Sequence, residues 1–214
     1  MKFSSNLVAV ICLVLSASIM AAPQGFISQE RCANTGGYGC GTSNNIYRLY
    51  LGVYGFNNVP HTEGDFHWAL IIGPKVEKNS PVVGFKFVNY GIHWRMKEQA
   101  VNDIRYDCQS MVARIVIAKV ADRVRLFDLL RKGADRAYHD DTKTFSGWIE
   151  AMLQTNIDDG KCVGTAELDF QKITAFAEDY VINKARAGRY EFKNEERFLP
   201  KPTYDLLAGK ELIP

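Results

Sequence analysis

The order of two hydrophobic periods along the chain constrains the fold more than any other feature. Four early segments alternate between apolar and polar residues or run apolar throughout, and we expect strands there, at 47–56, 66–72, 82–88 and 111–120. Three later segments have apolar residues at helical spacing, at 122–132 with Gly133 as its stop, at 145–155, and after a predicted cap at Thr165. Strands followed by helices in one domain predict an α+β fold, with a small antiparallel sheet packed against about three helices.

The second and third predicted strands are expected to form a hairpin, because a loop of roughly eight residues separates them. The pair Asp158–Asp159, followed by Gly160, is predicted to form a turn that ends the second helix. The last residues, 198–214, show no clear period.

The first 21 residues have the three parts of a secretory signal peptide. Lys2 supplies the positive charge, an almost wholly apolar run extends from Leu7 to Met20, and Ala21 and Ala22 provide small residues at the exit. The apolar run is shorter than the roughly 18 to 20 residues that a spanning helix needs, which argues against an uncleaved anchor. We therefore expect a secreted, extracellular protein without a membrane anchor, cleaved after Ala21 or Ala22.

The mature chain is predicted to hold a flexible N-terminal arm, residues 22–45, and a single α+β domain, residues 46–214. The arm is polar and rich in Gly, Asn and Ser. The formal net charge is only +2, so no basic excess indicates binding to nucleic acid or to an anionic membrane. We expect a monomer.

Four of the five cysteines remain after removal of the signal peptide, which contains Cys12. An even number in an exported chain predicts disulfides, and four cysteines allow three pairings. We favour Cys32–Cys40, because these two residues bracket a short Gly-rich loop, and this leaves Cys108–Cys162 as a long-range bond. Their spacing matches no common zinc pattern, and we expect no metal and no cofactor.

His67 is the histidine best placed for chemistry, because it lies near the start of an otherwise apolar strand. Such a histidine can act as a general base, although a hydrogen-bonded structural role is the more common one. Disulfide-bonded cysteines cannot supply a thiolate nucleophile for it. Ser146 is the remaining candidate, and its place before a helix is also that of an N-cap residue. The other mature histidines, at positions 61, 93 and 139, are expected at the surface.

Two motifs resemble an uncharacterised family of small fungal proteins. The segment Phe66-His67-Trp68-Ala69-Leu70-Ile71-Ile72-Gly73-Pro74-Lys75 resembles the hallmark of that family, and residues 202–214 are similar to its shared ending. The similarity extends over about residues 47–214. The family in turn resembles papain-like (NlpC/P60-type) hydrolases, in which a strand carries a histidine and a later helix opens with a cysteine. The resemblance implies a papain-like fold and gives His67 the position of the base.

The same resemblance assigns the nucleophile position to Phe145 and the position of a neighbouring asparagine to Thr144. A second family histidine falls at about Val88. Phenylalanine can neither ionise nor attack, so the chain keeps one histidine and lacks the nucleophile. A shift of one residue would bring Ser146 into that position, but no alignment register supplies a cysteine.

Together these features predict a secreted fungal effector, associated with virulence, that binds a host protein and is a pseudoenzyme. The alternative is an active secreted hydrolase, peptidase- or amidase-like, that uses His67. A structural cell-wall protein ranks last, because the chain has no repeats and no Ser/Thr-rich stalk.

Overall fold

The structure is a computed structural model that describes residues 46–55, 66–77, 82–90, 95–108, 110–138, 147–191 and 200–214. All of these residues belong to one unit, Asn44–Pro214. The predicted signal peptide and arm lie outside the described residues, and so do Ser146 and the three histidines that were expected at the surface.

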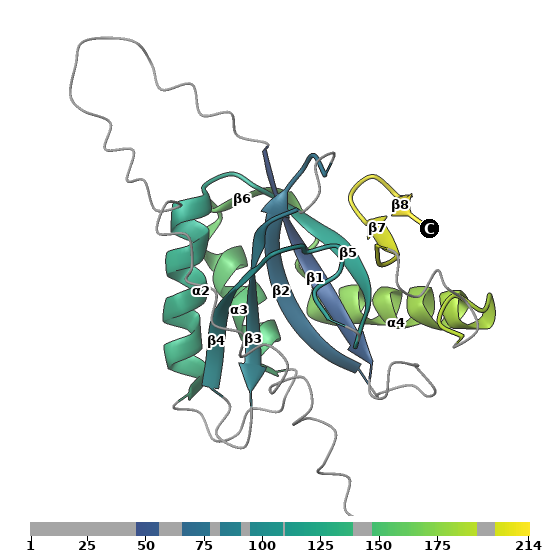
Figure 1. The fold of residues 1–214 in the computed structure, drawn as a ribbon. Helices are drawn as coiled ribbons and strands as arrows, with labels where there is room; N and C mark the ends of the chain where they lie inside the picture. The colour runs from purple at the N-terminus through teal and green to yellow at the C-terminus, as the bar shows by residue number, and fades with distance from the viewer. Residues whose placement is uncertain are drawn as a thin grey trace, which may run out of the picture. The chain divides into compact units, whose positions relative to one another are not determined.

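An eight-stranded sheet forms the frame of this unit (Figure 1). Its strands are β1 (Tyr47–Gly55), β2 (Phe66–Pro74), β3 (Gly84–Tyr90), β4 (Arg95–Val101), β5 (Met111–Val120), β6 (Val163–Ala166), β7 (Thr203–Asp205) and β8 (Lys210–Ile213). They are ordered β4-β3-β2-β1-β5-β7-β8, and β6 pairs with β5 beside this path. Neighbouring strands are antiparallel except β5 and β7, which are parallel.

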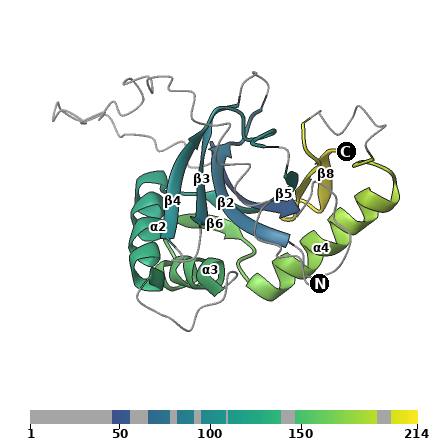
Figure 2. The same cartoon turned by 60° about the horizontal axis from the view of Figure 1, so that its bottom comes forward.

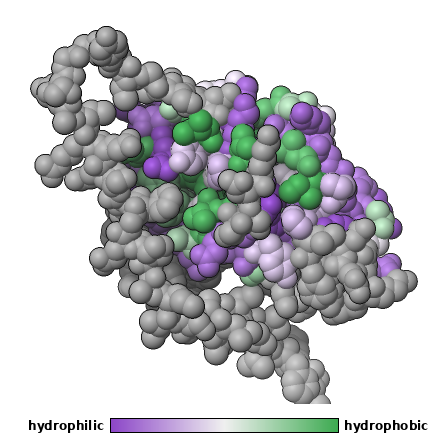
Figure 3. Space-filling model, turned by 45° about the horizontal axis from the view of Figure 1, so that its top comes forward, coloured by the Kyte–Doolittle hydropathy of each residue, from purple (hydrophilic) through white to green (hydrophobic). Residues whose placement is uncertain are grey.

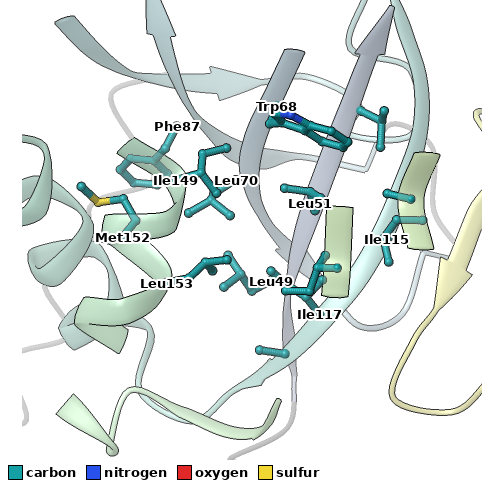
Figure 4. Close-up of a cluster of buried hydrophobic side chains, with 14 of the residues drawn as sticks. Leu49, Leu51, Trp68, Leu70, Phe87, Ile115, Ile117, Ile149, Met152 and Leu153 are labelled. Carbon is teal, nitrogen blue, oxygen red and sulfur yellow. The ribbon is translucent and has the colours of Figure 1, made fainter. Parts of the chain in front are cut away.

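Three helices in the described part of the chain cover one face of the sheet: α2 (Arg123–Tyr138), α3 (Gly147–Asp159) and α4 (Phe170–Arg186) (Figure 2). We call this the helix face. Its core contains apolar residues of the central strands and of all three helices. In Figure 4, Ile149 and Leu153 of α3 lie beside Leu70 of β2, and burial of such side chains is the main force that holds helix and sheet together.

The opposite face, which we call the loop face, carries a second and smaller core. Successive side chains of a strand point to opposite faces, so Leu49 and Leu51 of β1 join the helix-face core, whereas Tyr50 and Tyr54 join the other. Connecting segments cover the loop face. One of them, in the described part of the chain, is residues 102–108, which we call the covering segment and whose Ile104 and Cys108 pack in this core.

The covering segment is anchored by Ile104, which is fully buried. Its side chain fills a notch left by two glycines, Gly73 and Gly84. A Cβ atom on Gly73 would lie 2.1 Å from Ile104 Cδ1, and one on Gly84 would lie 2.5 Å from Ile104 Cγ2. The main chain adds two bonds, because Ile104 N donates to Val82 O at 2.9 Å and Lys201 N donates to the carbonyl oxygen of Arg105 at 2.8 Å.

The predicted α+β class is confirmed, as are the four early strands and the antiparallel pairing of the second and third. The sheet is larger than expected, because β4, β6, β7 and β8 were not predicted. The sequence of β4, Arg-Met-Lys-Glu-Gln-Ala-Val, is mostly polar and lies at an edge of the sheet. The other three strands have only three or four residues, too few to show a period.

Two predicted helix ends were wrong. Helix α2 does not stop at Gly133 but continues to Tyr138. The missing side chain serves packing instead, since a Cβ atom on Gly133 would lie 2.6 Å from Met152 Cε of α3. Thr165 lies in β6, and the cap of α4 is Asp169, whose side chain accepts a hydrogen bond from Lys172 N at 3.0 Å. The predicted turn at the end of α3 is confirmed, and Gly160 has a positive φ of 61° there.

Candidate functional site

His67 lies on the loop face of the sheet, beside Tyr54. It is the second residue of β2 and pairs with Tyr54 of β1. Its sequence neighbours Phe66 and Trp68 belong to the helix-face core, so the His67 ring points to the opposite face. Burial lowers the pKa of His67 below its ordinary value of 6.5, and the imidazole is therefore neutral at pH 7.

Helix α3, which would follow the nucleophile in a papain-like enzyme, packs on the other side of the sheet. Trp148 and Ile149 of its first turn are buried in the helix-face core. Val88, at the position that the resemblance gives to a second histidine, packs against the loop-face core. It therefore lies on the same face of the sheet as His67. Ser146 lies outside the described residues. The sheet separates the proposed base from the first turn of α3.

Two carboxylates lie on the loop face, and each is held by a cation and a tyrosine of the sheet. The first belongs to Asp107, in the covering segment. Its Oδ2 accepts a hydrogen bond from Tyr54 Oη at 3.1 Å and forms an ion pair with Lys86. Lys86 Nζ also lies 5.5 Å from the centroid of the Tyr54 ring. Both partners are buried, with 7% of Tyr54 and 6% of Lys86 exposed.

The second carboxylate belongs to Glu77, which follows β2. The guanidinium group of Arg114 donates to both of its oxygens, at 2.8 and 2.9 Å, and Tyr50 Oη donates to Oε1 at 2.8 Å. Arg114 also donates to Thr203 Oγ1 of β7, from Nε at 3.2 Å and from Nη2 at 2.9 Å. Burial, and then the negative charge of Glu77, raise the pKa of Tyr50, so the phenol stays protonated and donates.

The charge of the central strands explains this arrangement. Strands β1, β2, β3 and β5 contain no Asp or Glu, and their basic residues other than His67 are Arg48, Lys86, Arg114 and Lys119. The first three are no more than 6% exposed. Buried cations are stable only when paired, so the negative charge must come from outside these strands. Chemically, the loop face therefore presents cation and phenol donors that converge on carboxylate groups.

Hydrophobic period does not reveal this cluster, because Glu77 and Asp107 lie in connections between strands, which show no period. The signal that could have found it is a basic residue inside a buried strand. Lys86 and Arg114 are each flanked by apolar residues in runs that were predicted as strands. A buried lysine or arginine implies an acidic partner, although the sequence does not say which acidic residue it is.

The predicted Cys108–Cys162 disulfide is wrong. Cys162 has a free thiol in the helix-face core, and its Sγ donates to Asn156 Oδ1 at 3.1 Å. Cys108 packs against the loop-face core, with its Sγ 3.0 Å from Ser110 Oγ. The two residues lie at opposite ends of β5, since Met111 N donates to Cys108 O, and Ala121 N donates to Cys162 O.

The length of β5 gives the physical reason. Ten residues of strand span roughly 30 Å, whereas the Cα atoms of a disulfide lie within about 7 Å of each other. The favoured partner pair, Cys32 and Cys40, lies outside the described residues. Within the described ranges, no three His, Cys, Asp or Glu side chains form a group that could hold a metal ion.

The described surface adds no second candidate. The large apolar side chains exposed on it are Ile46, Val76, Val83, Val124, Ile157 and Leu212. In the view of Figure 3, apolar side chains form separate spots among hydrophilic ones. None of the helices described here combines the length and the apolar character needed to cross a bilayer. The paired carboxylates of the loop face therefore remain the most distinctive feature of the molecule.

The fold and this cluster define an α+β protein whose sheet holds two carboxylates of its own chain. Residues 47–213 match a family described as "Family of unknown function (DUF6914)", and the chain belongs to that family. Neither the comparison with curated proteins nor the comparison with solved structures gave a match.

Proposed function

We propose that the protein is an exported binding protein that has lost catalytic activity and acts on a host target. One observation carries the loss of catalysis: the sheet lies between His67 and the first turn of α3. A general base must come within about 3 Å of the proton that it removes, directly or through one water. A nucleophile placed directly before α3 would have to reach around the sheet to meet His67.

Export, the fungal source and the host target rest on the sequence. The signal-peptide pattern supports export, and the two motifs that resemble a fungal family support the source. A papain-like ancestry also belongs to this proposal, because the resemblance assigns His67 the base position and Phe145 the nucleophile position. A domain that keeps its core and loses its nucleophile retains a surface for binding.

The test is a measurement of turnover. The secreted protein and its His67→Ala variant are incubated with general peptide, amide and ester substrates. We expect both proteins to give the rate of the buffer alone. Turnover by the natural protein that disappears in the variant, with the fold intact by circular dichroism, would refute the pseudoenzyme proposal.

One observation favours a second candidate, a hydrolase with its nucleophile on the loop face. Cys108 and Ser110 lie at the same end of that face as His67, since Gly55 N donates to Ser110 O at 2.8 Å and the adjacent Tyr54 pairs with His67. This candidate predicts covalent labelling by a serine- or cysteine-directed probe. The label should disappear in Cys108→Ala or Ser110→Ala, and an unlabelled natural protein would exclude a nucleophile at either position.

A further inference from the structure

The donors that hold the Asp107 carboxylate all belong to the sheet, whereas Asp107 itself belongs to a connection. Tyr54 lies in β1 and Lys86 in β3, and together we call them the Lys86 receptor. Asp107 reaches them from the covering segment. The strands therefore form a carboxylate-binding group, and a separate segment fills it.

The second carboxylate repeats this arrangement. Arg114 lies in β5 and Tyr50 in β1, and together we call them the Arg114 receptor. Glu77 fills it from the residues that follow β2, with two guanidinium bonds and one phenol bond. A guanidinium fork that binds both oxygens of a carboxylate is the strongest common geometry for this group, and it suits an external carboxylate equally well.

The covering segment can leave the sheet without breaking a strand ladder. In the described part of the chain, its main chain is tied to other segments at Ile104 and Arg105, and its remaining main-chain bonds are internal or lead into β5. Side chains add to the attachment: Ile104 fills the glycine notch, Asp107 pairs with Lys86, the centroid of the Tyr106 ring lies 4.9 Å from Lys201 Nζ, and Cys108 packs against the loop-face core. Asp107 thus occupies the Lys86 receptor as a tethered side chain and does not belong to β1 or β3, the two strands that form the receptor.

We infer that the loop face binds an acidic peptide segment whose carboxylates replace those of Asp107 and Glu77. The inference rests on the proposed binding function and names the chemistry of its partner. A peptide fits better than a small dicarboxylate, because both present occupants are carboxylate side chains of a polypeptide. A tethered occupant competes at an effective concentration of the order of millimolar, so it weakens binding of the free peptide.

The experiment removes one tethered competitor. The Asp107→Ala variant and the natural protein are titrated with a glutamate-rich octapeptide by isothermal calorimetry at low salt. We expect the variant to bind at least tenfold more tightly. The matched control is Asp128→Ala, which removes the same charge from an exposed position on α2 and should bind like the natural protein.

Two double variants test whether the gain arises at the Lys86 receptor. Adding Lys86→Met or Tyr54→Phe to Asp107→Ala should return the affinity to that of the natural protein. Equal affinity of Asp107→Ala, Asp128→Ala and the natural protein overturns the inference. A gain in affinity for glutarate without a gain for the octapeptide also overturns it, because the ligand would then be a small dicarboxylate.

A folding control keeps the result decisive. Asp107→Ala leaves Lys86 without its buried partner, so thermal unfolding is followed for every variant. If Asp107→Ala does not fold, Asp107→Asn replaces it, since an amide removes the charge and still accepts the hydrogen bond of Tyr54. The titration is independent of the turnover assay. Turnover would sink the pseudoenzyme proposal alone, and absence of peptide binding would sink this inference alone.

Discussion

At the scale of single residues, Arg114 shows how the chain keeps a charge inside its core. Among the residues that the structure describes, it is the largest of the fully buried side chains, with 0% exposed. Its charge is balanced by Glu77, and Thr203 accepts two further hydrogen bonds. Removing one partner of such a pair costs roughly 3–5 kcal/mol, because the other is left uncompensated. Arg114 therefore couples β5, β7 and the residues after β2 in one network.

The thiol of Cys162 leads to a prediction at the same scale. Burial, and then the nearby charge of Asp159, raise the pKa of Cys162 to about 12. At pH 8 the thiolate fraction is then on the order of 10⁻⁴, and the side chain is also inaccessible. We expect no alkylation of Cys162 in the native protein during a one-hour incubation with iodoacetamide at pH 8, measured by peptide mass mapping.

The same protein unfolded in guanidinium chloride is the control, and there Cys162 should react fully. Rapid labelling in the native protein, or recovery of Cys162 in a disulfide-linked peptide, would contradict the packing described for the helix-face core.

At the scale of elements, the fit between the covering segment and the glycine notch is the most constrained contact. Gly73 and Gly84 lie opposite different atoms of Ile104. A methyl group on Gly73 meets the flexible end of that side chain. One on Gly84 meets Ile104 Cγ2 and also the carbonyl oxygen of Ile72, at 2.6 Å. The end of a side chain can move, but a carbonyl group of a strand cannot move without loss of the hydrogen bonds to the neighbouring strand.

This difference predicts a rescue. Gly73→Ala should destabilise the protein by about 1–3 kcal/mol through overpacking, and adding Ile104→Val should restore part of the loss because valine lacks Cδ1. Gly84→Ala should not be rescued by the same change, since valine keeps a Cγ2 group and the Ile72 oxygen remains. Guanidinium denaturation of these four variants, and of Ile104→Val alone, measures the coupling.

Gly164→Ala provides the control for the loss of a strand glycine as such, because its nearest new contact would be Lys119 O at an ordinary 3.8 Å. Equal rescue of both notch variants by Ile104→Val would show that the segment does not sit in the notch as described.

At the scale of the whole molecule, the chain completes its sheet with its last residues. Strand β7 pairs in parallel with β5, and β8 closes the hairpin beside it. Arg114 N donates to Pro202 O at 2.9 Å, so the final segment satisfies the backbone of β5 as well as its buried guanidinium group. The C-terminus thus belongs to the core architecture and is not a tail.

A truncation tests this conclusion. A chain that ends at residue 200 loses β7, β8 and Thr203, and it exposes the edge of β5. We expect it to lose several kcal/mol of the roughly 5–15 kcal/mol that stabilise a typical domain, and to unfold at much lower denaturant or to aggregate. Removal of Pro214 alone, which follows β8, is the control. Cooperative unfolding of the truncated chain at the natural midpoint would contradict the assigned role of the last strands.

Hydrophobic period was enough to predict the central strands and the presence of the helices, because burial imposes that period directly. Hydrophobic period did not predict the elements and helix ends that depend on something other than burial of an apolar face. Edge strands such as β4 and β8 gain little from burial, and Gly133 is retained for close packing against Met152. The disulfide prediction failed because an even cysteine count does not show that Cys108 and Cys162 lie on opposite faces of one sheet. His67 could be singled out from the sequence, but its separation from α3 follows only from strand alternation in three dimensions.

The absence of acidic residues from the four central strands has a consequence for how sequences of this kind can change. Connections between strands ordinarily tolerate substitutions and insertions freely. Here the connections that carry Glu77 and Asp107 neutralise the interior of the sheet, so one added or lost residue would misplace a buried counter-ion. In related chains we expect a neutral residue at position 107 to be accompanied by loss of the lysine at position 86. These short connections should then vary as slowly as the strands that they join.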